Sequence, residues 1–415
     1  PTITRNIIPS QPRDALITQP TITRNIIPSQ PRDALITQPT TIISPRSLDL
    51  TNANLDFIDL TKTKTAIKLF GPHKASGPDD FKPIVLQNLP DTVINTLCTL
   101  YKVSIALAYM PKRWTKSKVI FLAKPGREDY ADPNSYRPIS LCSFILKSLE
   151  RLVLFNLEDN YLITKPLSSA QHAFRKSKST DTALTEAVDK IESGLLRTKY
   201  TLGVFLDIAG AFNNLDFNSA IKSMRKRRFP SHIVKWYKFF LHNQQSTLDM
   251  DGMKYTRSLT KGTPQGGVLS PLIWNVNFDP ILEQLNKAPI KVIGFADDAA
   301  IFITGIDTTV MVDLIQPVLN KIVQWGVESG LKFNPTKTVS VMFTNKHAPK
   351  IPYKKIKINN QTVDYSSEVK YLGLTLDSKL NWNAHINSKI KKTKRLMFAI
   401  KSCINRKLGH KPNIF

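Results

Sequence analysis

A pair of adjacent carboxylates inside an apolar stretch constrains the fold of this chain more than any other feature. Residues 292–304 read "VIGFADDAAIFIT", which has the composition of a buried strand apart from Asp297 and Asp298. A lone carboxylate costs several kcal/mol to bury unless a cation or a full set of hydrogen-bond donors meets it. The folded chain must therefore bring one or the other to these two side chains.

A third acidic residue, Asp207, also ends an apolar stretch, "GVFLD". If the two strands are neighbours, the Asp207 and Asp297 carboxylates can jointly hold two divalent cations roughly 4 Å apart. Adjacent strand residues point in opposite directions, so we expect Asp297 rather than Asp298 to be the direct ligand. An ordinary turn-forming role is the alternative for any single Asp, but it explains poorly why both sites end apolar strands.

The charge of the chain is unevenly distributed. The formal net charge is +26, to which residues 1–60 contribute nothing and residues 261–345 contribute −1. Residues 61–260 carry a net +14 and residues 346–415 a net +13. A near-neutral centre between basic arms suits a metal site inside a cleft that holds a polyanion. A solvated basic surface is the alternative for a Lys-rich segment taken by itself.

The remaining composition argues against several classes of protein. At 415 residues the chain has room for roughly two or three lobes. No apolar run approaches the roughly 20 residues that cross a bilayer, so we expect no membrane association. The three cysteines lack CxxC or Cys/His spacing, which argues against a zinc module and a disulfide framework. The chain begins at Pro1 without a signal-peptide pattern, and we expect it to be a piece of a longer intracellular product.

One segment near the start occurs twice. "PTITRNIIPSQPRDALITQ" stands at 1–19 and again, unchanged, at 20–38. Two Pro-rich copies without a helical or strand period cannot build a solenoid, which needs about three repeats. We interpret residues 1–46 as a disordered leader and expect order to begin near Ser47.

The rest of the chain predicts strands and helices that do not alternate regularly. Strands are expected at 118–124 and after Tyr136, and "KVIGFADDAAIFIT" is expected to be a hairpin with both Asp at its tip. Helices are expected over Phe144–Leu162 and Thr308–Ser329, and another after an N-cap at Ser179 or Thr180. The tail has apolar residues at helical spacing among lysines, which predicts a basic amphipathic helix.

Several motifs stand in a particular order along the chain. They are "SGPDDF", "SYRPISL", "QHAFRKSKSTDTAL", "LDIAGAF", "GTPQGGVLSP", "FADD", "GLKFNPTKT" and "KYLG". Together they resemble the reverse transcriptase domain of non-LTR (LINE-type) retrotransposons, from about Thr65 to about Trp382. One such tetrapeptide is unspecific, whereas this many in order are very specific.

The resemblance implies an α+β right-hand polymerase fold with fingers, palm and thumb, in which an antiparallel palm sheet packs on helices. Residues 47–380 would form the fingers and palm, and residues 381–415 the start of a basic helical thumb. Asp207 and Asp297 would bind two Mg²⁺ ions, for which Mn²⁺ is an alternative. Asp298 would be the third acidic position, and the Ile208 carbonyl a further metal ligand.

The resemblance also implies a nucleotide site. Phe212 would pack against the sugar of the incoming nucleotide and exclude a 2′ hydroxyl, although a core Phe is the plain alternative. Gln265 and Gly266 would lie beside the nucleotide and template, where a Gly/Pro loop is otherwise only a turn. Arg137, with Lys118 or Lys124, would clasp the triphosphate, because a guanidinium forks onto phosphate.

Further roles follow from the last motifs. Lys337 would donate a proton to pyrophosphate, with a surface lysine as the alternative. The basic helix over 389–411 would track a phosphate backbone, with an affinity that falls with salt. The basic runs 225–228 and 391–395 are candidate nuclear signals, although nucleic-acid contact or solvation fits them as well. The primer grip would consist of Lys370, Tyr371, Leu372 and Gly373.

The function that the resemblance implies is RNA-directed DNA polymerisation. The partners would be an RNA template, a DNA primer and dNTPs, with an endonuclease domain upstream in the full element protein and action in the nucleus and cytoplasm. Asp80, Asn213 and the sequence "QHAFR" depart from the usual family residues, but none of them removes a metal ligand. A viral RNA polymerase, a group II intron maturase-like or telomerase-like enzyme, and an inactive relic that only binds nucleic acid are the alternatives.

Overall fold

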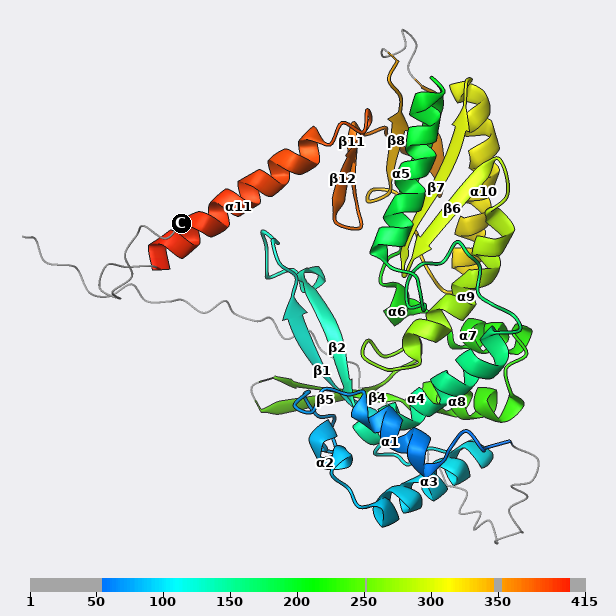
Figure 1. The fold of residues 1–415 in the computed structure, drawn as a ribbon, viewed down its shortest axis with the longest axis vertical. Coiled ribbons are helices and arrows are strands. Elements are labelled where there is room, and N and C mark those ends of the chain that lie inside the picture. The colour runs from blue at the N-terminus through cyan, green and yellow to red at the C-terminus, as the bar shows by residue number, and fades with distance from the viewer. Residues whose placement is uncertain (1–53, 251, 347–352, 404–415) are drawn as a thin grey trace, which may run out of the picture. The chain divides into compact units, whose positions relative to one another are not determined.

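The computed structural model describes residues 54–250, 252–346 and 353–403 (Figure 1). Contacts divide the chain into two compact units, Pro1–Asp49 and Leu50–Phe415, and every described residue belongs to the second. The duplicated leader and the expected start of order at Ser47 lie outside the described residues. No helix among the described residues is long and apolar enough to cross a membrane.

A four-stranded antiparallel sheet, called here the central sheet, carries all three acidic residues. Its strand order is β6-β7-β3-β8, where the strands are Ile290–Phe295, Asp298–Gly305, Tyr200–Leu206 and Val339–Phe343. Strand β3 pairs with β7 from Tyr200 opposite Gly305 to Leu206 opposite Ala299. The expected hairpin over "KVIGFADDAAIFIT" and the expected antiparallel sheet are both confirmed.

Helices cover both faces of the central sheet. Alternate strand residues such as Val204 and Ile301 share one core with α9 (Ser270–Leu285) and α10 (Thr308–Glu328). The opposite face, with Phe205 and Phe302, packs on α5 (Thr180–Leu196) (Figure 1). Ser179 caps α5 in a capping box with Thr182, as its position in the sequence predicts. Because the strands alternate, each face has its own apolar set.

A second four-stranded sheet, called here the fingers sheet, has the order β2-β1-β4-β5. Its strands are Tyr136–Cys142, Lys116–Ala123, Gln245–Met250 and Met253–Ser258, and only β1 and β4 run parallel. Tyr136–Cys142 leads directly into α4 (Phe144–Leu157), and the predicted helix over Phe144–Leu162 ends in a π-helical turn, Glu158–Leu162. The helices near this sheet are α1 (Leu60–Lys68), α2 (Pro83–Gln87), α3 (Asp91–Ala106) and α8 (Ser231–Asn243).

The remaining elements complete the described chain. They are a 3₁₀ turn (Pro133–Ser135), α6 (Ala211–Asn214), α7 (Phe217–Lys226), β9 (Ile356–Ile358), β10 (Gln361–Val363), β11 (Glu368–Tyr371), β12 (Leu374–Asp377) and α11 (Asn383–Cys403). The α11 helix follows the β11–β12 hairpin and corresponds to the expected basic helix, whose residues 404–411 lie outside the described range.

A buried ion pair links α9 to the turn after α7. The Arg227 guanidinium donates to the Asp279 carboxylate, and both side chains are almost fully buried. The second Asp279 oxygen accepts the Ser168 N–H, and Arg227 also donates to the carbonyls of residues 165 and 166. One arginine of the basic run 225–228 is therefore a structural residue of the core. This location counts against reading all four residues as an exposed nuclear signal.

We expect Asp279→Ala to lower the free energy of unfolding by about 3–5 kcal/mol, because it leaves the Arg227 charge buried without its partner. Urea titration measures the change. Glu283→Ala is the matched control, since Glu283 lies one turn further along α9 and is exposed. Equal stabilities of the two variants would contradict this account of the ion pair.

Candidate active site

The pairing of β3 with β7 brings the acidic residues together. Beyond the pair of Leu206 and Ala299, the next positions along the two strands are Asp207 and Asp298. Asp297 lies in the two-residue turn between β6 and β7, because Phe295 already pairs with Asp298. Strand alternation therefore does not decide between the two adjacent carboxylates, since Asp297 belongs to the turn and not to a strand.

The electrostatics reflect this gathering of like charges. Burial, together with the nearby Asp207 carboxylate, raises the pKa of Asp297, while Arg137 acts in the opposite direction. Burial and the charges of Asp297 and Asp207 raise the pKa of Asp298 to about 6. Carboxylates that are close together and lack a full countercharge shift in this direction, which is typical of functional sites.

The backbone beside Asp207 pairs with the segment around Phe333. Ile208 forms an antiparallel bridge with Phe333, in which the Asp207 carbonyl accepts the Asn334 N–H at 3.0 Å. In such a bridge the carbonyl of the paired residue itself points away from its partner. The Ile208 carbonyl therefore points away from the segment around Phe333.

These donors fit a hard divalent cation. Carboxylate and carbonyl oxygens are the ligands of Mg²⁺, which proteins usually hold with one or two carboxylates, the remaining positions going to water and substrate phosphates. Within the described ranges, no group of three or more His, Cys, Asp or Glu side chains is arranged as a metal site by itself.

Three aromatic rings line up beside the acidic residues. Phe212 lies in α6, the short helix after Asp207, and is partly exposed. The Trp274 ring packs on it at 5.5 Å between centroids and 34° between planes. Phe174 meets it edge-on at 6.2 Å, with its own ring about half exposed and a backbone φ of +55°. Phe212 is therefore held between two other rings, one of them open to solvent.

The segment 262–269 before α9, called here the Gly-rich loop, joins the parts of the site. Thr263 N–H donates to the Phe212 carbonyl at 2.7 Å, and Ser140 N–H in β2 donates to the Gln265 carbonyl at 2.8 Å. Gly266 has a φ of +126°, and a Cβ there would lie 2.6 Å from the Ser140 carbonyl oxygen. A side chain is excluded at Gly266 both by this contact and by its backbone conformation.

The fingers sheet presents basic side chains on the face that carries Arg137. In the β1–β2 register, Arg137 lies opposite Leu122 and Lys118 opposite Leu141, so Lys118 shares that face. Both are exposed and form no ion pair within the described chain. Lys124 instead donates to the Asn134 carbonyl at 2.8 Å. Of the two candidate lysines, Lys118 is exposed on the face of Arg137, whereas one of the three donors of Lys124 is used by the Asn134 carbonyl.

A cavity of about 790 Å³ opens between the fingers sheet, α4 and the Gly-rich loop. Its walls include apolar side chains of β1 and β2, the backbone at Gly266, the open ring of Phe174, and the basic side chains of Lys147 and Arg151. Apolar walls with a basic rim suit a nucleotide, which has a flat base and a charged phosphate.

The remaining candidates lie around this centre. Lys337 is exposed in the turn that follows Asn334, whose N–H bonds to Asp207. Leu372 and Gly373 form the two-residue turn of the β11–β12 hairpin, both with positive φ, as a type I′ turn requires. Tyr371 is buried against Phe205 of the central sheet, whereas Lys370 is exposed. Tyr371 therefore anchors the hairpin.

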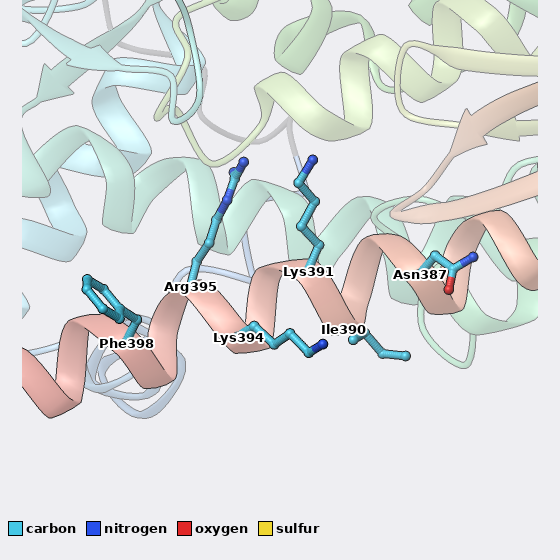
Figure 2. Close-up of a pocket in the computed structure, with 6 residues that line it drawn as sticks. All are labelled: Asn387, Ile390, Lys391, Lys394, Arg395 and Phe398. Atoms are coloured by element: carbon cyan, nitrogen blue, oxygen red, sulfur yellow. The ribbon is translucent and has the colours of Figure 1, made fainter.

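The α11 helix carries basic and apolar side chains on its exposed surface. Figure 2 shows Lys391 and Arg395 extending from the same side of this helix, as residues one turn apart do. Together with Asn387, Ile390, Lys394 and Phe398 they line a cavity of about 620 Å³. Lys389 to Lys401 are exposed throughout, which fits the expectation of a polyanion-binding helix.

The structure accounts for the departures from the family pattern. Asp80 has a φ of +58°, a conformation that glycine adopts freely and Asp tolerates better than most residues. Asn213 is exposed on α6. His172 is buried and its Nδ1 is 2.8 Å from the Thr182 hydroxyl. None of the three lies among the oxygen ligands.

Sequence motifs missed a buried carboxylate that supports the Gly-rich loop. Glu150 of α4 accepts the Val268 N–H at 2.9 Å through Oε2, while its Oε1 is buried without a partner among the described residues. Burial raises its pKa to about 7, although the Val268 N–H acts in the opposite direction. A charged residue at an apolar helix position is the only signal in the sequence, and it does not reveal the contact with a loop more than a hundred residues away.

Comparison with known proteins identifies the family. The profile of the family "Reverse transcriptase (RNA-dependent DNA polymerase)" matches residues 122–376, more than half of the chain. The chain belongs to the reverse transcriptase family. Reverse transcriptases use divalent metal ions, an RNA template, a primer and dNTPs, in keeping with the oxygen donors described above.

Several relatives of this chain are named as polymerases of mobile elements. "RNA-directed DNA polymerase from mobile element jockey" of Drosophila melanogaster is 27% identical over 87% of this chain and 40% of its own length. "Probable RNA-directed DNA polymerase from transposon BS" of the same species is 29% identical over 82% of this chain and 38% of its own length. The chain thus spans about two fifths of the length of these relatives.

More distant matches include a further mobile-element protein and a solved structure. A "Retrovirus-related Pol polyprotein from type-1 retrotransposable element R1" of Bradysia coprophila is 25% identical over 79% of this chain and 32% of its own length. A solved structure of truncated apo telomerase from Candida tropicalis aligns with a TM-score of 0.42 and 12% identity, over 71% of this chain and 60% of that chain.

We expect Glu150→Gln to change how stability depends on pH. The folded protein holds the Glu150 proton up to about pH 7, whereas the unfolded chain releases it near 4.5, so rising pH through this window destabilises the wild type. The glutamine does not titrate. Urea titrations at about pH 5 and pH 8 should show the variant gaining stability relative to wild type at the higher pH.

Glu192→Gln is the control for this experiment, because Glu192 is exposed on α5. An equal pH effect in both variants would show that Glu150 does not titrate in the way described.

Proposed function

We propose that this chain is the polymerase segment of a non-LTR retrotransposon protein, which extends a DNA 3′ end on an RNA template. The observation that carries the proposal is the meeting of Asp207, Asp297 and Asp298 at the ends of paired strands, beside Phe212 and the Gly-rich loop. Residues 47–380 serve as fingers and palm, and residues 381–415 begin the thumb.

Asp207, Asp297 and the Ile208 carbonyl hold two Mg²⁺ ions, which Mn²⁺ can replace, with Asp298 as the third acidic group. When bound, the ions polarise the primer 3′ hydroxyl and compensate the charge of the leaving pyrophosphate. The protein contributes positioning and charge, and no nucleophilic side chain is needed. The raised pKa values of Asp297 and Asp298 support this role, because a bound cation would supply the countercharge that these carboxylates lack.

The nucleotide lies between the fingers sheet and the rings. Arg137 and Lys118 bind its triphosphate, since both are exposed on one sheet face without an ion-pair partner in the described chain. Phe212 packs against its sugar, and Gln265 with Gly266 lies beside its base and the template. Lys337 donates a proton to the pyrophosphate.

The primer and template extend away from this centre. The β11–β12 hairpin, with Lys370 through Gly373, holds the primer end, and the exposed lysines of α11 bind a phosphate backbone in a salt-dependent manner. An endonuclease domain upstream in the full element protein and action in the nucleus and cytoplasm complete the proposal.

We expect Asp297→Ala to reduce RNA-templated primer extension by more than about a hundredfold, because a metal ligand is worth several kcal/mol in the transition state. RNA binding, measured by filter binding, should change little. Asp298→Asn is the matched variant and should retain more activity. Equal activity of wild type and Asp297→Ala would refute the ligand assignment, and an inactive wild type would favour a relic that only binds nucleic acid.

We expect Phe212→Ala to lower the preference for dNTPs over rNTPs by at least about tenfold, because the ring no longer excludes the 2′ hydroxyl. Single-nucleotide incorporation gives kcat/KM for each nucleotide. Phe217→Ala is the control, since Phe217 is a buried ring five residues further on that packs on His242 instead. Unchanged selectivity in Phe212→Ala would exclude the ring as the steric gate.

A further inference from the structure

A buried tryptophan is hydrogen-bonded to the turn that carries Asp297. Trp274 of α9 is fully buried, and its Nε1–H donates to the Ala296 carbonyl at 2.7 Å. Ala296 has a φ of +55°, a conformation that costs a residue with a Cβ roughly 1 kcal/mol or more. A turn with such a residue needs support from its surroundings, and the indole N–H is one source of that support.

The same side chain supports the ring beside the nucleotide. The ring centroid of Trp274 lies 5.5 Å from that of Phe212 in α6. On its own helix, Trp274 packs on Phe278 at 5.8 Å between ring centroids. Phe278 in turn packs on Trp325 of α10 at 5.0 Å. The indole is thus held by a chain of rings from the core, which leaves its plane and its N–H direction little freedom.

Two elements of the site therefore share one support. Phe212 follows Asp207 on the chain, whereas Ala296 precedes Asp297, and Trp274 contacts both from a third element. A shift of the indole would move the metal-binding turn and the aromatic wall together. A misplacement of about 1 Å in such a site can cost roughly a hundredfold in rate.

We propose that Trp274 is a positioning residue that holds the Asp297 turn and the Phe212 ring in register, so that metal binding and sugar selection depend on one side chain. This inference rests on the proposed function. The indole N–H holds the turn through the Ala296 carbonyl, and the indole ring packs on Phe212. Substitutions can remove the hydrogen bond and the ring contact separately.

Trp274→Phe keeps a ring against Phe212 but removes the N–H. We expect kcat for RNA-templated extension to fall about tenfold, with the dNTP KM and the dNTP over rNTP preference each within about twofold of wild type. Replacement of Trp274 by benzothienylalanine keeps the indole shape without the donor and should give the same result. Trp274→Leu removes both contributions and should also lower the nucleotide preference by about fivefold or more.

The chain offers a matched control in Trp236→Phe. Trp236 of α8 is also fully buried, and its Nε1–H donates to the Ser104 hydroxyl at 3.1 Å, in a part of the core that contacts neither Phe212 nor the Asp297 turn. Both substitutions should lower the melting temperature to a similar extent. A purely structural role of Trp274 predicts equal kcat values for the two variants, and that result would overturn the proposal.

A second measurement needs no turnover. Mn²⁺ binding in the presence of dTTP, followed by electron paramagnetic resonance, should be at least about threefold weaker in the benzothienylalanine variant than in Trp236→Phe. Equal Mn²⁺ affinities would also overturn the proposal. If the wild type fails to extend a primer on RNA, the proposed function is wrong, whereas the Mn²⁺ comparison still decides on Trp274.

Discussion

The pairing of β3 with β7 is the constraint on which the rest of the site depends. It joins two stretches about ninety residues apart and places Asp207 beside Asp297 and Asp298, so that three like charges converge at one end of the central sheet. Their mutual repulsion and partial burial oppose folding, and the apolar ladder behind them, buried on both faces, provides the opposing stabilisation. The three acidic residues are thus brought together by the fold itself.

The Gly-rich loop connects the elements around this centre. Its backbone forms hydrogen bonds to Phe212 in α6, to Ser140 in β2 and to the Glu150 carboxylate in α4. One loop is thus fixed to three separate parts of the fold. Gly266 permits the closest of these approaches, since a Cβ there would collide with the Ser140 carbonyl. Loops placed by a rigid scaffold in this manner are typical of catalytic sites.

The basic charge is divided between surface and core. Arg137, Lys118 and the lysines of α11 are exposed and suit contact with phosphates, and they supply part of the positive excess on either side of the near-neutral centre. Arg227 shows that a charge run is not uniform, because its guanidinium is buried against Asp279. Charge counted along a sequence therefore indicates the kind of partner without showing which cations meet it.

The sequence by itself determined the class of fold, the order of the motifs, the strands that lead into Asp207 and Asp297, and the N-cap at Ser179, because these depend on local pattern and spacing. Only the tertiary structure decided that Asp298 stands across the ladder from Asp207, that Glu150 holds the loop, and that Trp274 joins Phe212 to the Asp297 turn. Those contacts join residues up to about 120 positions apart, and they arise from packing and register, for which a single sequence carries no local signal.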